Sequence, residues 1–237
     1  MKRFYTSVSL FENGDTLNLT LDGKTLRTPQ GQAFIIPSCL AQLIENEWTS
    51  ATTLIEPSKM PATQIAMTAQ DLYDSKATEW NSEILSYLNT DLLCYWTNNQ
   101  PQISKKQEEL FGSILRRLED KVSKKIPIHF ELTHHIAPHY LQDMIKDYIN
   151  RLDKLYCTAF YLMTLETGST LLTLAMFYNL VTVDEVYTSV FLDEIIKAEI
   201  YNEDFYGSAP DLEKKQIAVK NFLTVAQTMI QSLSMKP

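Results

Sequence analysis

The sequence predicts an α+β protein, in which a small β-rich N-terminal domain with flanking helices is followed by an all-helical C-terminal bundle domain. Three observations lead to this prediction. Short runs separated by turn residues fill the first 37 residues, the apolar spacing becomes helical after Pro37, and every segment from Pro138 onward fits a helix. We place the boundary in the stretch 90–105, which gives domains 1–97 and 98–237.

Four strands are expected at the N-terminus. Leu17, Leu19 and Leu21 alternate with polar residues, which is the period of a sheet with one buried face. Asp22-Gly23 lies between two such runs and is a strong signal for a two-residue type I′ turn, because both central residues of that turn need positive φ. The expected strands span residues 4–11, 16–21, 24–28 and 33–36.

Helical spacing begins after these strands. We expect one helix from Ser38, a suitable N-cap, to about Ala51. Pro61 suits a first helical position and opens a second helical stretch. A separate helix is expected from about Lys76 to Leu88. Residues 91–96 are compatible with a short strand or with the end of a helix.

The rest of the chain predicts helices at about 104–125, 138–153, 155–166, 169–179, 183–202 and 211–233, with a possible strand at 126–132. Thr182 and Glu185 form a capping box. Residues 155–181 hold one charge, Glu166, and are long enough to span a membrane. Gly168 is a natural C-cap and Ser169 a natural N-cap, so we predict two buried helices there and no membrane insertion.

The composition excludes several function classes. The chain of 237 residues has six glycines, and no two of them lie closer than eight residues apart, so glycine-rich phosphate loops and the nucleophile elbow are absent. A net charge of −8 argues against a nucleic-acid partner. Three widely spaced cysteines fit a reducing compartment, and no secretory signal is present. We expect a bacterial cytoplasmic protein, or a processed protein of the mitochondrial matrix.

Four histidines lie within eleven residues, and they are the strongest candidates for a chemical site. A metal-dependent hydrolase could use His134, His135, His139 and Glu131. His135 and His139 are four residues apart, but Pro138 argues against one helix spanning both. No other residues mark a catalytic set, so we expect a binding protein that is not an enzyme and has no cofactor. A general helical-bundle adaptor stays an alternative.

Several short segments occur in the order and at the spacing of one protein family. They are Arg3-Phe4-Tyr5, Leu21-Asp22-Gly23-Lys24, Glu47-Trp48, Met60-Pro61-Ala62-Thr63, Thr68-Ala69 with Asp71, Thr90-Asp91-Leu92-Leu93-Cys94-Tyr95, Gly168-Ser169 with Leu172, Leu174 and Ala175, Asp193-Glu194 and Glu203-Asp204. Together they resemble the assembly chaperones for the alpha subunit of the F-type ATP synthase catalytic head. The chain departs from that family's pattern at Gln64, at Phe111-Gly112-Ser113 after Gln107, and at Tyr201-Asn202.

The resemblance implies an ATP-independent chaperone with an N-terminal α+β domain and a C-terminal helical domain. Such a protein binds the unassembled alpha subunit and shields its interface until the beta subunit takes its place. We expect it to be a monomer. By resemblance, Glu194 contacts the client with Asp193 beside it, through pairing with a basic residue of the alpha subunit. The alternative is that Glu194 only solvates its helix.

Overall fold

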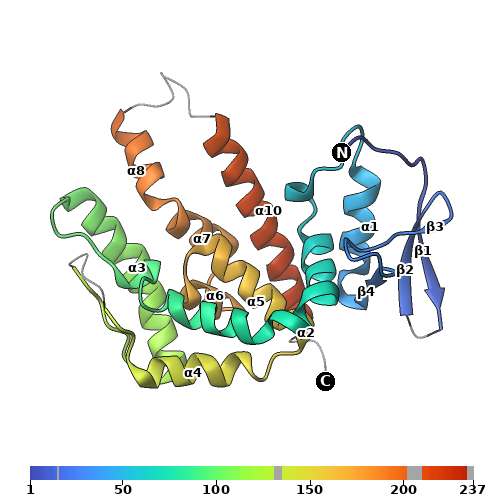
Figure 1. Cartoon of the computed structure of the whole chain (residues 1–237). Coiled ribbons are helices and arrows are strands. Elements are labelled where there is room, and N and C mark those ends of the chain that lie inside the picture. Colours follow the sequence, from blue (N-terminus) through green and yellow to red (C-terminus); the bar gives the residue numbers. More distant parts are fainter. Residues whose placement is uncertain (15, 131–134, 202–209, 234–237) are drawn as a thin grey trace.

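The computed structural model describes residues 1–14, 16–130, 135–201 and 210–233. Figure 1 shows a small sheet and a neighbouring helix at one side of the molecule, with helices making up the rest. The α+β class is therefore confirmed, since the strands come first in the chain and the helices follow.

Strand β2 (Thr16–Leu21) is the centre of a four-stranded antiparallel sheet in the described part of the chain. It pairs along its whole length with β1 (Val8–Asn13), and over two residues each with β3 (Lys24–Thr25) and β4 (Ile35–Ile36). Leu19 and Leu21 are buried, as their alternation predicted. Asn18 is buried as well, and its side-chain amide is satisfied by donating to the Phe34 carbonyl oxygen at 2.7 Å.

Three of the strands are shorter than predicted, and β1 begins at Val8 because the chain before it has other partners. The Arg3 amide donates to the Thr53 carbonyl oxygen at 2.9 Å, and the Arg3 guanidinium donates to the Ala51 carbonyl oxygen at 2.7 Å. The segment before β1 is thus tied to the residues that follow the first helix.

The predicted hairpin turn is confirmed. Asp22 and Gly23 have φ values of 49° and 76°, as a type I′ turn requires. The Asp22 carboxylate accepts hydrogen bonds from the backbone amides of Ser7 at 2.8 Å and Thr6 at 3.0 Å. These bonds favour the charged form and lower the pKa of Asp22 to about 2.

A single long helix replaces the two that we expected between Pro61 and Leu88. It follows α1 (Ala41–Ser50) and two 3₁₀ turns, η1 (Ser38–Leu40) and η2 (Pro57–Lys59). This helix, α2, spans Pro61–Tyr87 without a break, because no glycine or proline interrupts it. It packs against α1 and also against α4, α5 and α10. The boundary between residues 97 and 98 stays a prediction.

The helical part is built around α5 and α6, whose residues are mostly buried. Its helices are α3 (Pro101–Val122), α4 (His139–Ile149), α5 (Lys154–Thr167), α6 (Thr170–Phe177), α7 (Val183–Val190), α8 (Leu192–Tyr201) and α10 (Pro210–Leu233). Helix α5 lies along α2, where the rings of Trp80 and Tyr161 stack at a centroid distance of 4.7 Å. No helix in the described ranges is long and apolar enough to cross a membrane.

The predicted break between α5 and α6 is confirmed. Gly168 has a φ of 64° and donates its amide to the Thr164 carbonyl oxygen, while Ser169 accepts from the Leu172 amide. The capping box of Thr182 and Glu185 is also present at the start of α7.

Three other segments differ from the element expected there. Residues 91–96 form no strand of their own and contain a 3₁₀ turn, η3 (Leu92–Cys94), because the Asp91 side chain accepts the Leu93 amide and closes the turn. The helix expected over 183–202 is interrupted at Phe191, whose backbone leaves the helical region while its ring is buried. In the described part of 126–132, the expected strand is reduced to one parallel bridge between His129 and Tyr95.

Candidate functional site

Several of the short segments that resemble the chaperone family are joined in space by hydrogen bonds to two carboxylates, those of Asp91 and Glu47. We call each set of bonds a junction. In the first, the fully buried Asp91 accepts the Ser169 hydroxyl at 2.6 Å and the Leu171 amide at 2.9 Å. Burial raises the pKa of Asp91 to about 6, while these hydrogen bonds oppose the shift. One carboxylate therefore caps both η3 and the start of α6.

The second junction ties α1 to the start of α2. The Glu47 carboxylate accepts the amides of Ala62 at 2.7 Å and Thr63 at 2.9 Å, and the Thr63 hydroxyl at 2.7 Å. Trp48 donates its indole N–H to the same hydroxyl at 3.1 Å. Burial raises the pKa of Glu47, and the hydrogen bonds from Thr63 and Ala62 oppose that shift. Both junctions position backbone, and Trp48 and Thr63 of the second junction also line a pocket beside the start of α2.

A cleft of about 230 Å³ does lie where α8 begins, and we call it the Asp193 cleft. Its walls come from the segment before α3, from α3 itself, from the chain before α4, and from the first turn of α8. The lining residues are Tyr95, Trp96, Thr97, Asn98, Asn99, Gln100, Ile103, Gln107, Phe130 and Asp193. Its surface combines one carboxylate with amides and aromatic rings, a mixture suited to a protein partner.

Gln107 and Trp96 fix the wall of the Asp193 cleft. The buried Gln107 side chain accepts the Thr97 amide at 2.8 Å, and the Trp96 indole donates to the Leu93 carbonyl oxygen at 2.9 Å. The family departure at Phe111-Gly112-Ser113 lies directly behind this wall. A Cβ at Gly112 would come within 3.2 Å of the Trp96 ring, so the glycine lets the indole approach α3.

The structure separates the histidines of the hydrolase hypothesis. His139 is the first residue of α4 and exposed, whereas His135 precedes the helix and stacks on His129 at a ring-centroid distance of 3.7 Å. Burial and the neighbouring His135 lower the pKa of His129. Glu131 and His134 lie outside the described residues. Among those described, no three histidine, cysteine, aspartate or glutamate side chains are placed to hold a metal.

Of the two candidate client-binding residues, the Asp193 cleft includes only Asp193. Asp193 is exposed at the first turn of α8, and the partly exposed Glu194 is not among the lining residues. Successive helical residues point about 100° apart, so the pair covers two adjacent directions. The second acidic pair, Glu203-Asp204, lies outside the described residues.

The sequence of the first half of the chain decides the family. Residues 2–119 match the sequence model of the ATP12 chaperone protein family. The chain belongs to this family. Curated relatives include the mitochondrial protein atp12 of Schizosaccharomyces pombe, 24% identical over 136 residues, and the mitochondrial protein ATP12 of Saccharomyces cerevisiae, 27% identical over 144 residues. The matched parts cover 53% and 50% of this chain, and they span less than half of each relative, 46% and 44%.

Solved structures extend the likeness over nearly the whole chain. A crystal structure from Agrobacterium tumefaciens covers 98% of this chain and 86% of its own, with a TM-score of 0.84 at 24% identity. The crystal structure of Atp12 from Paracoccus denitrificans covers 97% of both chains, with a TM-score of 0.79 at 20% identity. These likenesses show that the ATP12 family fold includes the helices beyond residue 119.

The sequence analysis missed the residues that give the Asp193 cleft its shape. Trp96 and Phe130 were not proposed as site residues, although 53% of Phe130 is exposed. An aromatic residue at a core-like spacing gives no sign that it faces solvent. Only the folded chain places Phe130 beside Asp193, which is 63 positions further along.

Proposed function

We propose that this chain is an ATP-independent assembly chaperone for the F-type ATP synthase. In this proposal it binds the unassembled alpha subunit and shields the surface that later contacts the beta subunit. The membership of residues 2–119 in the ATP12 chaperone family carries the proposal. The proposal assigns the chain no catalysis and no cofactor, and it places the monomer in a bacterial cytoplasm or a mitochondrial matrix.

The physical reason for such a chaperone is the apolar interface of an isolated ring subunit. A subunit that exposes a large apolar surface before assembly tends to aggregate. A protein that covers this surface needs no nucleotide hydrolysis, because the true neighbour can displace it by binding more tightly. A chaperone that works in this way needs a surface that binds the client, and it needs no catalytic site.

The Asp193 cleft supports one location for client contact. Asp193 presents an exposed carboxylate beside the Trp96 and Phe130 rings, and Glu194 adds a second carboxylate on the next helical position. We propose that the two acids orient a basic residue of the alpha subunit, and that the rings contact neighbouring apolar groups. Electrostatic pairing of this kind sets orientation and association rate.

Co-expression tests the function. The chain should raise the soluble yield of the alpha subunit and should co-purify with it, whereas the alpha subunit alone should aggregate. Unchanged solubility together with no complex would reject the proposal. A lysate capture that returns only proteins unrelated to ATP synthase would support the general adaptor instead.

The acidic pair is tested by Glu194→Lys and Asp193→Lys. Each should weaken the complex with the alpha subunit about tenfold or more, because attraction becomes repulsion. Each should lower the melting temperature by no more than a few degrees, because it replaces a favourable negative charge in the first turn of α8. Glu12→Lys is the matched control, since it makes the same charge change at an exposed position of β1, far from α8 (Figure 1). If the loss of binding is matched by an equally severe loss of thermal stability, the two acids stabilise the fold and the result does not support client contact.

A further inference from the structure

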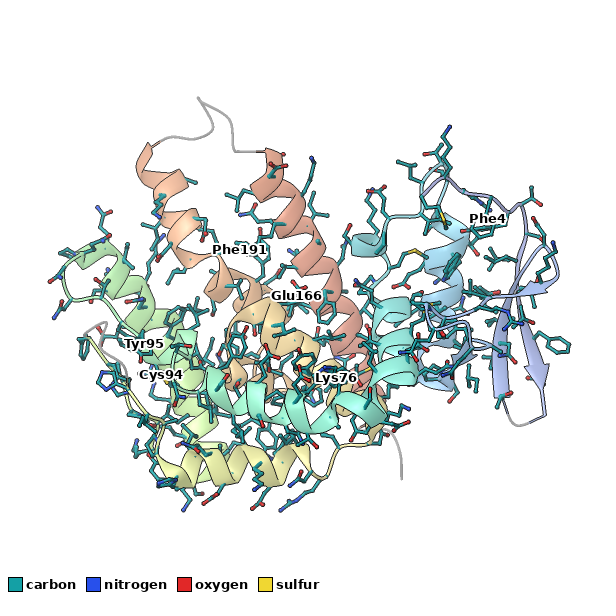
Figure 2. The ribbon with its side chains drawn as sticks, in the orientation of Figure 1. Phe4, Lys76, Cys94, Tyr95, Glu166 and Phe191 are labelled. Atoms are coloured by element: carbon teal, nitrogen blue, oxygen red, sulfur yellow. The ribbon has the colours of Figure 1, made fainter. Side chains whose placement is uncertain are left out.

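A second concave surface lies on the N-terminal part, and we call it the Phe4 groove. It runs between the first residues of the chain, the segment that follows β3, and the first three turns of α2. Its volume is about 570 Å³, and its apolar lining includes Phe4, Leu26, Pro29, Met60, Met67 and Leu72. Figure 2 shows Phe4 and Tyr95 at opposite sides of the molecule, so this groove is separate from the Asp193 cleft.

Large apolar side chains of the Phe4 groove are open to solvent. Phe4 is 62% exposed and Leu72 is 37% exposed. Met67 lies half-buried between the two ends of the lining, and methionine adapts its flexible side chain to irregular apolar partners. A partner that covers these side chains removes apolar surface from water, which favours binding.

Cationic side chains outnumber acidic ones around the Phe4 groove. Arg27 and Asp71 are the charged side chains of its lining. A neighbouring hollow, formed in part by the same N-terminal segment, adds Lys2 and Arg3. Three cationic side chains thus accompany one acidic side chain, in a chain whose net charge is −8. The local charge is therefore opposite in sign to the charge of the whole chain.

Two acidic side chains near the groove are held within the chain itself. Asp71 accepts the Gln30 amide at 3.0 Å through Oδ2, and its Oδ1 is shielded from solvent. Glu56 precedes the lining residue Pro57 and pairs with Lys59 at 2.8 Å. Neither carboxylate is therefore placed to attract a cation from outside.

Arg27 is the cation of the lining that an occupant can reach. It is exposed just beyond β3, and its Nη1 donates to the Gly31 carbonyl oxygen at 2.7 Å, which orients the guanidinium. None of the described carboxylates pairs with it, so its other N–H groups remain for a ligand. A guanidinium is a planar fork that matches the two oxygens of a carboxylate.

We infer that the Phe4 groove binds an apolar segment of a partner protein that carries an aspartate or glutamate, with the carboxylate pairing with Arg27. Apolar side chains of the segment cover Phe4, Met67 and Leu72. This inference rests on the proposed function, because an unassembled client is the expected source of the segment. An acidic contact here and a basic contact at Asp193 would together fix the orientation of the client.

A basic segment and a neutral apolar segment fit the groove less well. The first would place like charges near Lys2, Arg3 and Arg27. The second would cover the Arg27 guanidinium without giving it a partner. The charge of the probe therefore separates both alternatives from the inference.

Three nonapeptides of leucine, alanine and serine serve as probes, and they differ only in a central glutamate, glutamine or lysine. Each has blocked ends and the same tetramethylrhodamine label. Fluorescence anisotropy should show that the glutamate peptide binds about tenfold more tightly than the glutamine peptide, and that the lysine peptide binds most weakly.

The net charge of −8 by itself would favour the lysine peptide, so the expected order requires the local cations. Equal affinities, tighter binding of the lysine peptide, or no binding of the glutamate peptide would overturn the inference.

Two substitutions of Arg27 test the partner of the carboxylate. Arg27→Gln should remove most of the preference for the glutamate peptide over the glutamine peptide. Arg27→Lys should keep a preference of about threefold or more, because the charge remains although the fork is lost. Arg151→Gln is the matched control, since it removes the same charge at an exposed position that lines a different pocket. Loss of the preference in Arg27→Lys or in Arg151→Gln as complete as in Arg27→Gln would contradict the inference.

Phe4→Ser tests the apolar part of the contact. It should weaken the glutamate and glutamine peptides alike, by about fivefold or more, because apolar contact is lost while Arg27 remains. Phe11→Ser is the matched control, since Phe11 is 56% exposed on β1 and does not line the groove. Equal affinities of the two variants for the glutamate peptide would show that the peptide does not bind in this groove.

Laurate competition separates a protein segment from a fatty acid, which also combines an apolar chain with a carboxylate. The inhibition constant of laurate should exceed the Kd of the glutamate peptide, because a single acyl chain covers less of the lining. An inhibition constant below that Kd would assign the groove to a fatty acid and overturn the inference.

Capture of the co-expressed alpha subunit separates this inference from the proposed function. Arg27→Glu should capture less alpha subunit than the wild type, because it repels an acidic segment. If it captures as much, the groove is not used for the client and the inference is wrong, while the function stands. If the wild type captures none, the function is wrong, and the peptide titrations still decide whether the groove binds acidic apolar segments.

Discussion

The Ser169 hydroxyl donates a 2.6 Å hydrogen bond to Asp91, and the two residues are 78 positions apart in the chain. Both are fully buried. The same carboxylate accepts the backbone amides of Leu93 and Leu171. The turn η3, which leads toward α3, and the first turn of α6 are therefore held at one point, close behind the segment that forms the wall of the Asp193 cleft.

Asp91→Ala should lower the free energy of unfolding by about 3 kcal/mol or more, because three buried donors lose their acceptor. Urea unfolding measures this loss. Asp74→Ala is the control, since the Asp74 side chain is 83% exposed and its ion pair with Lys154 should contribute less than about 1 kcal/mol. Equal losses in the two variants would show that the Asp91 junction is not a stabilising unit.

The Asp91 carboxyl also predicts a pH dependence. Burial raises its pKa from 3.8 to about 6, so the folded state holds the proton more tightly than the unfolded state does. Its contribution to stability is complete below pH 3.8 and is lost as the pH rises through 6. The stability of the wild type relative to Asp91→Asn should fall by about 2–3 kcal/mol across this window. Urea titrations at several pH values would contradict this if the difference stayed constant.

Glu47 should be an essential cap for α2. Glu47→Ala removes the acceptor for two backbone amides and a hydroxyl, and it should cost about 2 kcal/mol of unfolding free energy. Glu45→Ala, on the same helix, should cost less than about 1 kcal/mol because the hydrogen bond that Glu45 accepts from Gln42 is 3.5 Å long. Thermal unfolding compares the two, and a smaller effect at Glu47 would refute the capping role.

Arg117 should couple α3 to α7. Its guanidinium donates to Glu185 Oε1 at 2.6 Å and also to the Leu180 carbonyl oxygen, and both charged side chains are about two-thirds buried. A double-mutant cycle with Arg117→Met and Glu185→Gln should give a coupling free energy of about 1 kcal/mol. Additive effects within about 0.3 kcal/mol would show that the pair contributes no specific interaction.

Local signals predicted the pieces of the fold well. The Asp22-Gly23 turn, the Gly168-Ser169 break and the capping box at Thr182 all depend on residues within four positions of each other, and all three are present. The break expected inside α2 failed, because polar residues such as Asp74 and Ser75 are also compatible with an exposed helix face. Residues 91–96 failed because their strand-like composition was outweighed by a side-chain cap from Asp91.

The candidate site was predicted only in part. The sequence drew attention to Asp193 and Glu194 by resemblance, and their role in client binding stays a prediction. It gave no indication that Asp193 would line one cleft with Trp96 and Phe130, because that depends on how the segments before α3 and α4 lie against the first turn of α8.

By itself, the sequence determined the α+β class, the turns and caps, and the absence of glycine-rich loops, since these follow from residue type and short spacing. The tertiary structure alone decided that the scattered motifs meet in the Asp91 and Glu47 junctions. It also decided which large apolar side chains stay open to solvent, such as Phe4 and Phe130. The physical reason is that burial depends on the packed chain. The type of a residue sets the free energy of exposing or burying its side chain, and only its neighbours in space determine whether that side chain is buried and hydrogen-bonded.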